Sequence, residues 1–131
     1  MGETLNDIGV IGLAVMGRNL VLNIADRGFA VAAYNRTASV TEAFAATLQP
    51  GQRVLPCYSL EQMAASLIRP RRVLVMVKAG PAVDAVIDQL QELLEPGDTL
   101  VDGGNSHFED TERRVALLAA RGIHYLGMGI S

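Results

Sequence analysis

The sequence is poor in several features that mark large classes of protein. It contains a single cysteine, Cys57, so no disulfide can form within the chain. No run of about 18 apolar residues occurs without a charged residue, which argues against a membrane-spanning helix. The beginning carries Glu3, Asn6 and Asp7 rather than the positive charges of a secretion signal. These absences predict a protein of a reducing compartment, and the cytoplasm is the default expectation.

Basic residues are outnumbered by acidic ones. Eleven basic residues stand against 14 acidic ones, the net charge is −3, and Lys78 is the only lysine. This balance argues against a nucleic-acid partner, and the lack of a long apolar run argues against a membrane partner. Half of the 131 residues are hydrophobic and 19% are charged, as in an ordinary globular protein. We therefore expect one folded domain over residues 1–131.

The chain does contain a regular alternation of short apolar runs with longer helix-like segments. The runs are rich in β-branched residues and too short for helices, so they predict strands. Three Ser-x-x-Glu/Gln patterns predict helix starts at Ser39, Ser59 and Ser106. The expected strands are Ile8–Leu13, Phe29–Tyr34, Val54–Leu55, Val73–Val77, Thr99–Asp102 and His124–Met128. The expected helices cover about Met16–Arg27, Ser39–Leu48, Ser59–Leu67, Pro81–Leu94 and Ser106–Arg121.

This alternation predicts the α/β fold class. Strands that are apolar on both faces and separated by helices form parallel sheets covered on both sides. Right-handed crossovers then give a doubly wound arrangement. The chain stops at Ser131, directly after the last expected strand and without a closing helix. We expect this stop to be a cut in a longer protein.

A glycine-containing loop follows the first expected strand. Its residues are Gly12, Leu13, Ala14, Val15, Met16 and Gly17. The spacing resembles the G-x-G-x-x-G fingerprint of Rossmann-like dinucleotide-binding domains, in which the loop and the next helix N-terminus hold a pyrophosphate. Ala14 replaces the second glycine, so we expect its Cβ to keep the pyrophosphate slightly further away. The alternative is a tight turn that binds nothing.

The end of the second expected strand bears on the choice of cofactor. NAD-binding domains usually carry an acidic residue there, which binds the ribose 2′-hydroxyl. This chain has Asn35, Arg36 and Thr37 instead. The planar guanidinium of Arg36 suits a phosphate, and Thr37 adds a hydroxyl, so the tripeptide favours NADP over NAD. The alternative is a solvated polar turn before a helix.

Polar residues at the ends of the later strands offer few candidates for catalysis. Lys78 could be catalytic, but a lysine at a strand end is more often a surface charge, which is the role expected here. Asp102 could act as a base, but strand-end carboxylates often cap a helix or bind backbone. His107 and His124 are expected to be packing or surface residues. No cluster has the spacing of metal ligands.

Taken together, these motifs resemble the 6-phosphogluconate dehydrogenase family, over Ile8 to Ser131. The resemblance rests on Gly12–Leu20, on Asn35–Thr37, and on later segments. Those segments are Met76–Gly80 and Asp102–Ser106, followed by the pairs Asp110–Thr111 and Arg113–Arg114. The related β-hydroxyacid dehydrogenases share the fold and an Asn-Arg-Thr, but they usually have glycine at the position of Ala14 and lack the Asp102–Ser106 string.

The resemblance implies a role for each matching residue. Gly12 to Gly17 would hold the pyrophosphate of NADP, and Asn35, Arg36 and Thr37 would hold its 2′-phosphate. Three strand-end residues would line the cofactor by backbone and stem contacts: Val77, Lys78 and Ala79. Asn105 would contact both the nicotinamide and the substrate, and Ser131 would begin the family's substrate loop.

The resemblance also implies the activity of the parent enzyme. That activity is the NADP-dependent oxidative decarboxylation of 6-phosphogluconate to ribulose 5-phosphate in the pentose phosphate pathway and gluconate utilisation. The family's catalytic lysine and glutamate, and the helical domain that forms its homodimer, lie beyond residue 131. No catalytic residue is therefore expected in this chain, and Lys78 does not inherit that role. The alternatives are a β-hydroxyacid dehydrogenase and a stand-alone NADP-binding module.

Overall fold

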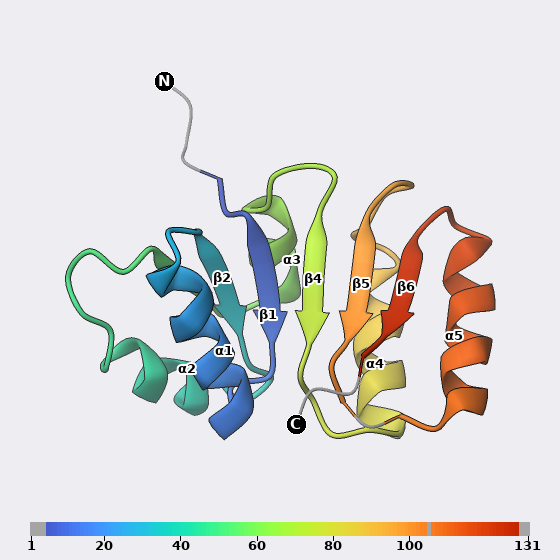
Figure 1. Ribbon diagram of the computed structural model, residues 1–131, viewed down its shortest axis with the longest axis horizontal. Coiled ribbons are helices and arrows are strands. Elements are labelled where there is room, and N and C mark those ends of the chain that lie inside the picture. Colours follow the sequence, from blue (N-terminus) through green and yellow to red (C-terminus); the bar gives the residue numbers. More distant parts are fainter. Residues whose placement is uncertain (1–4, 105, 129–131) are drawn as a thin grey trace.

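The computed structural model describes residues 5–104 and 106–128, and shows one six-stranded parallel sheet with five helices (Figure 1). The strands are β1 (Ile8–Ile11), β2 (Val31–Tyr34), β3 (Val54–Cys57), β4 (Arg72–Val75), β5 (Thr99–Asp102) and β6 (His124–Gly127). The helices are α1 (Val15–Asp26), α2 (Ala38–Ala45), α3 (Leu60–Ala65), α4 (Pro81–Leu90) and α5 (Phe108–Ala119). In this part of the chain no helix has the length and apolarity needed to cross a membrane.

The strand order is β3-β2-β1-β4-β5-β6, with every neighbouring pair parallel. At the centre, Val10 of β1 lies opposite Ala33 of β2 on one side and Leu74 of β4 on the other. The chain first winds outward from β1 to β3 and then crosses back to β4. This is the strand order of the Rossmann fold, so the predicted doubly wound parallel sheet is confirmed.

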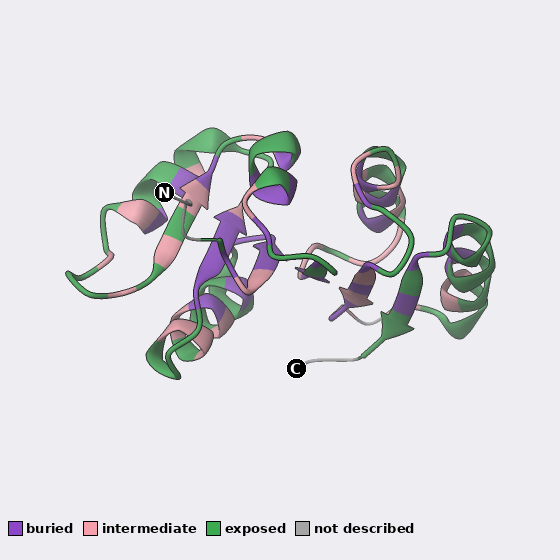
Figure 2. Ribbon diagram, turned by 90° about the horizontal axis from the view of Figure 1, so that it is seen from above, coloured by how far each residue is buried: buried purple, intermediate pink, exposed green. Residues whose placement is uncertain are grey.

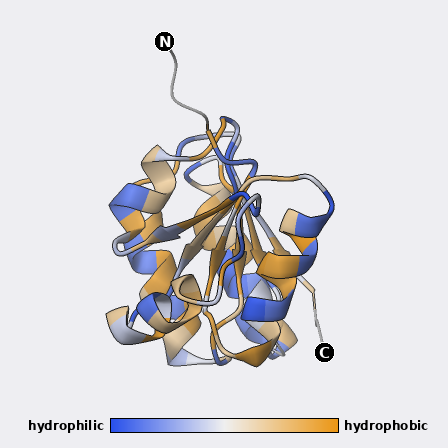
Figure 3. Cartoon of the chain, turned by 90° about the vertical axis from the view of Figure 1, so that its left-hand side faces the viewer, coloured by the Kyte–Doolittle hydropathy of each residue, from blue (hydrophilic) through white to orange (hydrophobic). Residues whose placement is uncertain are grey.

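Helices cover both faces of the sheet (Figure 2). α1 and α2 pack on one face, where Val21 and Phe44 meet Val10 and Val31. α3, α4 and α5 pack on the opposite face, where their apolar side chains join one larger cluster that includes Val75. Figure 3 shows largely hydrophobic strands lying between helices that carry both hydrophobic and hydrophilic residues.

The predicted helix starts are correct in one case and wrong in two. Ser59 caps α3 as predicted, since its hydroxyl accepts the backbone N–H of Gln62 at 3.0 Å. α2 begins at Ala38 after Thr37, so the predicted cap at Ser39 is wrong. α5 begins at Phe108 after His107, so the predicted cap at Ser106 is also wrong. Ser106 uses its hydroxyl in a buried network instead of capping a helix.

β3 is longer than predicted and contains the single cysteine. The predicted strand ends at Leu55, whereas β3 continues to Cys57, which pairs in register with Tyr34 of β2. Its side chain is fully buried under α3. Burial raises the pKa of the Cys57 thiol to about 11, which keeps it protonated and unreactive at neutral pH.

Candidate functional site

The carboxyl ends of β1 and β4 form the point where the chain changes direction across the sheet. The loop after β1 leads to α1 on one face, and the loop after β4 leads to α4 on the other. Ligands of open α/β sheets bind in the crevice between two such diverging loops. The sequence motifs of interest follow β1, β2, β4 and β5, so the parallel sheet brings their strand ends to one edge (Figure 1).

Two glycines shape the loop after β1. Gly12 has φ +103°, and a Cβ there would lie 2.6 Å from the backbone oxygen of Met76 in the neighbouring strand end. A Cβ on Gly17 would clash with the backbone oxygen of Gly12. Both positions therefore exclude any larger residue, which explains the first and third glycines of the fingerprint.

The start of α1 leaves its backbone donors facing the carboxyl edge. Ala14 precedes the helix in an extended conformation, and no side chain caps the helix or places an acid in its first turn. The apolar side chains of Val15 and Met16 are 62% and 39% exposed here. Uncapped N–H groups with the positive end of a twelve-residue helix dipole favour an anion. This arrangement fits a pyrophosphate over an apolar rim.

Asn35 connects the end of β2 to the glycine loop. Its side-chain oxygen accepts the backbone N–H of Leu13 at 2.9 Å, and its amide nitrogen donates to the Thr37 oxygen at 3.4 Å. The sequence predicted a direct phosphate contact for Asn35 and missed this connection, which joins residues 22 positions apart. Arg36 and Thr37 are exposed beside the start of α2. Their phosphate contact stays a prediction.

The loops after β4 and β5 lie against each other at the same edge of the sheet. A Cβ on Gly104 would lie 3.2 Å from the Val77 oxygen, so only a small residue allows this approach. Val77 and Ala79 are half-buried and Lys78 is exposed, as expected for a surface charge. The predicted site residues Asn105 and Ser131 lie outside the described residues.

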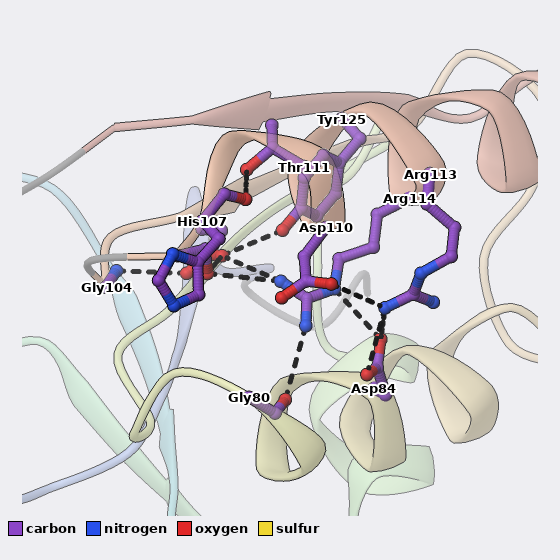
Figure 4. Close-up of polar contacts among 11 residues, drawn as sticks. Gly80, Asp84, Gly104, His107, Asp110, Thr111, Arg113, Arg114 and Tyr125 are labelled. Carbon is purple, nitrogen blue, oxygen red and sulfur yellow. Dashed lines mark hydrogen bonds and ion pairs between the residues drawn. The ribbon is translucent and has the colours of Figure 1, made fainter.

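Asp102, at the end of β5, is fully buried, and Figure 4 labels two of its hydrogen-bond partners, Gly104 and Tyr125. Its carboxylate accepts the N–H of Gly104 at 2.9 Å and the hydroxyls of Ser106 and Tyr125 at 2.5 and 2.8 Å. Burial raises the pKa of the Tyr125 hydroxyl above its usual value, and the hydrogen bond to Asp102 raises it further. Asp102 therefore binds its own loop, the outcome that the sequence favoured over a general base.

Arg114 of α5 completes this network from the core side. Its side chain is fully buried, and Nε donates to Asp84 at 2.9 Å. The two terminal nitrogens donate to the Ser106 hydroxyl at 3.1 Å and to the Gly80 oxygen at 3.2 Å. Arg114 therefore connects the loop after β4 to the loop after β5.

The sequence places Arg114 in the Arg113–Arg114 pair of the family resemblance but predicts no role for its side chain. One signal was available, because Arg114 lies four positions before Leu118 on the face of α5 that is buried. An arginine on an apolar stripe needs buried acceptors to offset its desolvation. Those acceptors come from α4 and from the ends of β4 and β5, which sequence spacing does not bring together.

Other features of the described residues lie away from this edge. A groove of about 730 Å³ lies at the opposite, amino edge of the sheet and is lined by Asp7, Ile8, Asn23, Ile24, Arg27, Phe29 and Arg72. His107 and His124 are exposed. Within residues 5–104 and 106–128, no group of three His, Cys, Asp or Glu side chains is arranged to hold a metal ion.

Comparison with known proteins gives a consistent result over the whole chain. The family model described as the NAD binding domain of 6-phosphogluconate dehydrogenase matches residues 7–131. A decarboxylating 6-phosphogluconate dehydrogenase of Synechococcus elongatus is 60% identical over 97% of this chain and 27% of its own length. The Cunninghamella elegans enzyme is 54% identical over 100% of this chain and 27% of its own length. The chain thus spans about a quarter of these curated relatives.

Solved structures agree with the fold. The 6-phosphogluconate dehydrogenase of Plasmodium falciparum, described in its apo form and in complexes with NADP+ and with 6-phosphogluconate, is 41% identical. It matches with a TM-score of 0.84 over 91% of this chain and 26% of that chain. A 3-hydroxyisobutyrate dehydrogenase of Mycobacterium tuberculosis shares the fold at 20% identity, with a TM-score of 0.76 over 94% of this chain and 40% of that chain.

Proposed function

Because the chain belongs to the family of NAD-binding domains of 6-phosphogluconate dehydrogenase, we propose that it binds NADP+ at the carboxyl edge of its sheet. The observation that carries the proposal is the pairing of the glycine loop with an exposed arginine at the end of β2. Asn35 ties these two segments together through Leu13, and Arg36 stands where an NAD-binding domain has an acid. The NADP+ complex of the Plasmodium falciparum relative supports the same cofactor.

The described residues fit such a cofactor. A Cβ at Gly12 or Gly17 would run into neighbouring backbone, so only glycine lets the loop close against the start of α1. The uncapped N–H groups of that helix suit the pyrophosphate, and the guanidinium of Arg36 suits the dianionic 2′-phosphate. Val77, Lys78 and Ala79 would line the second half of the cofactor. NADP+, when bound, supplies a hydride acceptor.

We further propose that the parent protein catalyses the oxidative decarboxylation of 6-phosphogluconate, as the names of the relatives suggest, with ribulose 5-phosphate as the product that the family resemblance implies. In this proposal the chain binds and orients the cofactor, and Asn105 and Ser131 contribute to the substrate site. No proton-transfer group is assigned to the chain, since Asp102 is buried and occupied. A cytoplasmic homodimer for the parent protein rests on the family resemblance alone.

The cofactor assignment is tested by measuring NADP+ and NAD+ affinities of the wild type and Arg36→Ala by calorimetry. Loss of a charge-assisted contact costs about 1.5–3 kcal/mol, so NADP+ should bind roughly 10- to 150-fold more weakly. NAD+ binding should barely change, because it lacks the 2′-phosphate.

Arg27→Ala is the matched control for this experiment. Arg27 is an exposed arginine at the opposite, amino edge of the sheet, so its loss should leave both affinities unchanged. Equal weakening of NADP+ and NAD+ in Arg36→Ala would contradict the 2′-phosphate assignment. A wild type that binds NAD+ as tightly as NADP+ would do the same.

A further inference from the structure

The buried network around Arg114 lies on one half of the proposed cofactor site only. The Rossmann fold consists of two mononucleotide-binding halves that meet at the switch point. The half made by β1, β2 and β3 carries Arg36, and the proposed 2′-phosphate places the adenosine there. The half made by β4, β5 and β6 therefore receives the nicotinamide side. All contacts of Arg114 fall in this second half.

Backbone bonds and side chains both hold the turns of that half, and in the turn after β4 the oxygen of Gly80 accepts the N–H of Val83 at 3.0 Å. The N–H of Gly103 donates to the Val75 oxygen at 2.9 Å, and beyond it the loop after β5 leaves the sheet. From that point Asp102 holds Gly104 and Ser106 by hydrogen bonds to the backbone and the hydroxyl. Arg114 holds Ser106 from the other side and also holds the oxygen of Gly80. One guanidinium thus bonds to both turns, beyond the point where the backbone bond from Gly103 to Val75 joins the two strand ends.

The charges make this arrangement rigid. Arg114 and Asp102 are both fully buried, 3.7 Å apart, and Tyr125 closes the remaining side of the carboxylate. Breaking a buried charge pair by removing one partner is strongly unfavourable, so the side chains have little freedom to rearrange. The hydrogen bond from Arg114 also lowers the pKa of Asp84, which keeps this second partner ionised.

We propose that Arg114, acting through Ser106, Asp102 and Gly80, is a positioning residue that fixes the nicotinamide half of the cofactor site. The proposal rests on the proposed NADP+ function and deepens it. Arg114 itself is buried behind the turns, so it acts on the cofactor only through them. Asn105, a predicted cofactor residue, lies in the sequence between Gly104 and Ser106, the two residues that the network holds.

The test compares two ligands that differ only in the half they occupy. NADP+ spans both halves, whereas adenosine 2′,5′-bisphosphate occupies the adenosine half alone. Calorimetry on the full chain should show Arg114→Met binding NADP+ more weakly by on the order of tenfold or more, since misplaced binding groups lose most of their contribution. Its affinity for the bisphosphate should stay within about twofold of the wild type.

The neighbouring arginine supplies a matched control. Arg113 also contacts Asp84, at 3.3 Å, but it is half exposed and has no contact with Ser106 or Gly80 among the described residues. Arg113→Met should leave both affinities unchanged. If Arg114→Met does not fold in a thermal melt, Ser106→Ala replaces it, because that change removes the bridging hydroxyl without removing a charge.

Each outcome decides the proposal. Selective weakening of NADP+ supports it. Equal weakening of both ligands would show a general structural role, and unchanged binding would show no role. A wild type that binds the bisphosphate as tightly as NADP+ would also overturn it, because the nicotinamide half would then contribute nothing. If the wild type binds neither ligand, the proposed cofactor function itself fails.

Discussion

Asp102 and Asp84 both lie near Arg114, but solvent reaches only one of them. Asp102 is fully buried and accepts three hydrogen bonds from its own loop and from Tyr125. Asp84 is 37% exposed and receives one bond from Arg114 and two from Arg113. The first carboxylate is a structural acceptor in the core, and the second is a titratable partner at the rim.

Asp84 should therefore contribute to the pH dependence of stability. Hydrogen bonds from Arg114, and then from Arg113, lower its pKa below the ordinary value of 3.8. A carboxyl whose pKa is lowered in the folded state stabilises the fold above pH 3.8, and the contribution disappears as the pH falls through the folded-state value. Urea unfolding of the wild type and Asp84→Asn should show a stability difference at pH 6 that shrinks at pH 3.

A constant difference between pH 6 and pH 3 would contradict this role of Asp84. Asp88 on the same helix is exposed and makes no ion pair with the described residues, so Asp88→Asn serves as the control. It should change stability little at either pH.

Two kinds of residue show what sequence alone could and could not reveal about the site. The roles of the glycines were predicted, because a position that needs positive φ or close backbone approach favours glycine, and this preference is visible at a single residue of the sequence. The contacts of Asn35 and Arg114 were not predicted. Each joins segments more than 20 positions apart, so the partner is fixed by the sheet rather than by local spacing.

At the scale of single elements, the helix starts show why a local pattern can mislead. Ser39, Ser59 and Ser106 all begin the same Ser-x-x-Glu/Gln pattern. Only Ser59 directly precedes the first residue of a helix and caps it. α2 begins one residue before Ser39. The Ser106 hydroxyl donates to Asp102 and accepts from Arg114. Hydrogen bonds to charged groups are stronger than a bond to a backbone N–H at a helix start, so this hydroxyl does not cap α5.

Alanine substitutions at Ser59 and Ser39 should separate the true cap from the apparent one. Ser59→Ala removes the acceptor for Gln62 N–H and should lower the free energy of unfolding by about 1 kcal/mol. Ser39→Ala should be neutral or slightly stabilising, because Ser39 lies inside α2 and alanine is the better helix former. Chemical denaturation of both variants measures this, and an equal loss in the two would refute the assignment.

For the whole molecule, the order of apolar runs was sufficient to predict the fold. Six short β-branched runs separated by helices admit few parallel arrangements once crossovers are right-handed. The same order places the ends of β1, β2, β4 and β5 at one edge, so the location of the site follows from the topology. The strand limits were predicted less well. In β3, Pro56 argues against a continuing strand, yet the pairing with β2 extends through it to Cys57.

The burial of Cys57 makes the chain's one thiol a natural reporter of how the sheet opens. A pKa of about 11 instead of 9.0 leaves roughly 100-fold less thiolate near neutral pH, and alkylation by iodoacetamide must wait until the strand is released. β3 is an edge strand that pairs only with β2, so we expect it to fray locally. The alkylation rate should then hardly change in low urea, whereas a steep urea dependence would mean that the edge opens only when the whole domain unfolds.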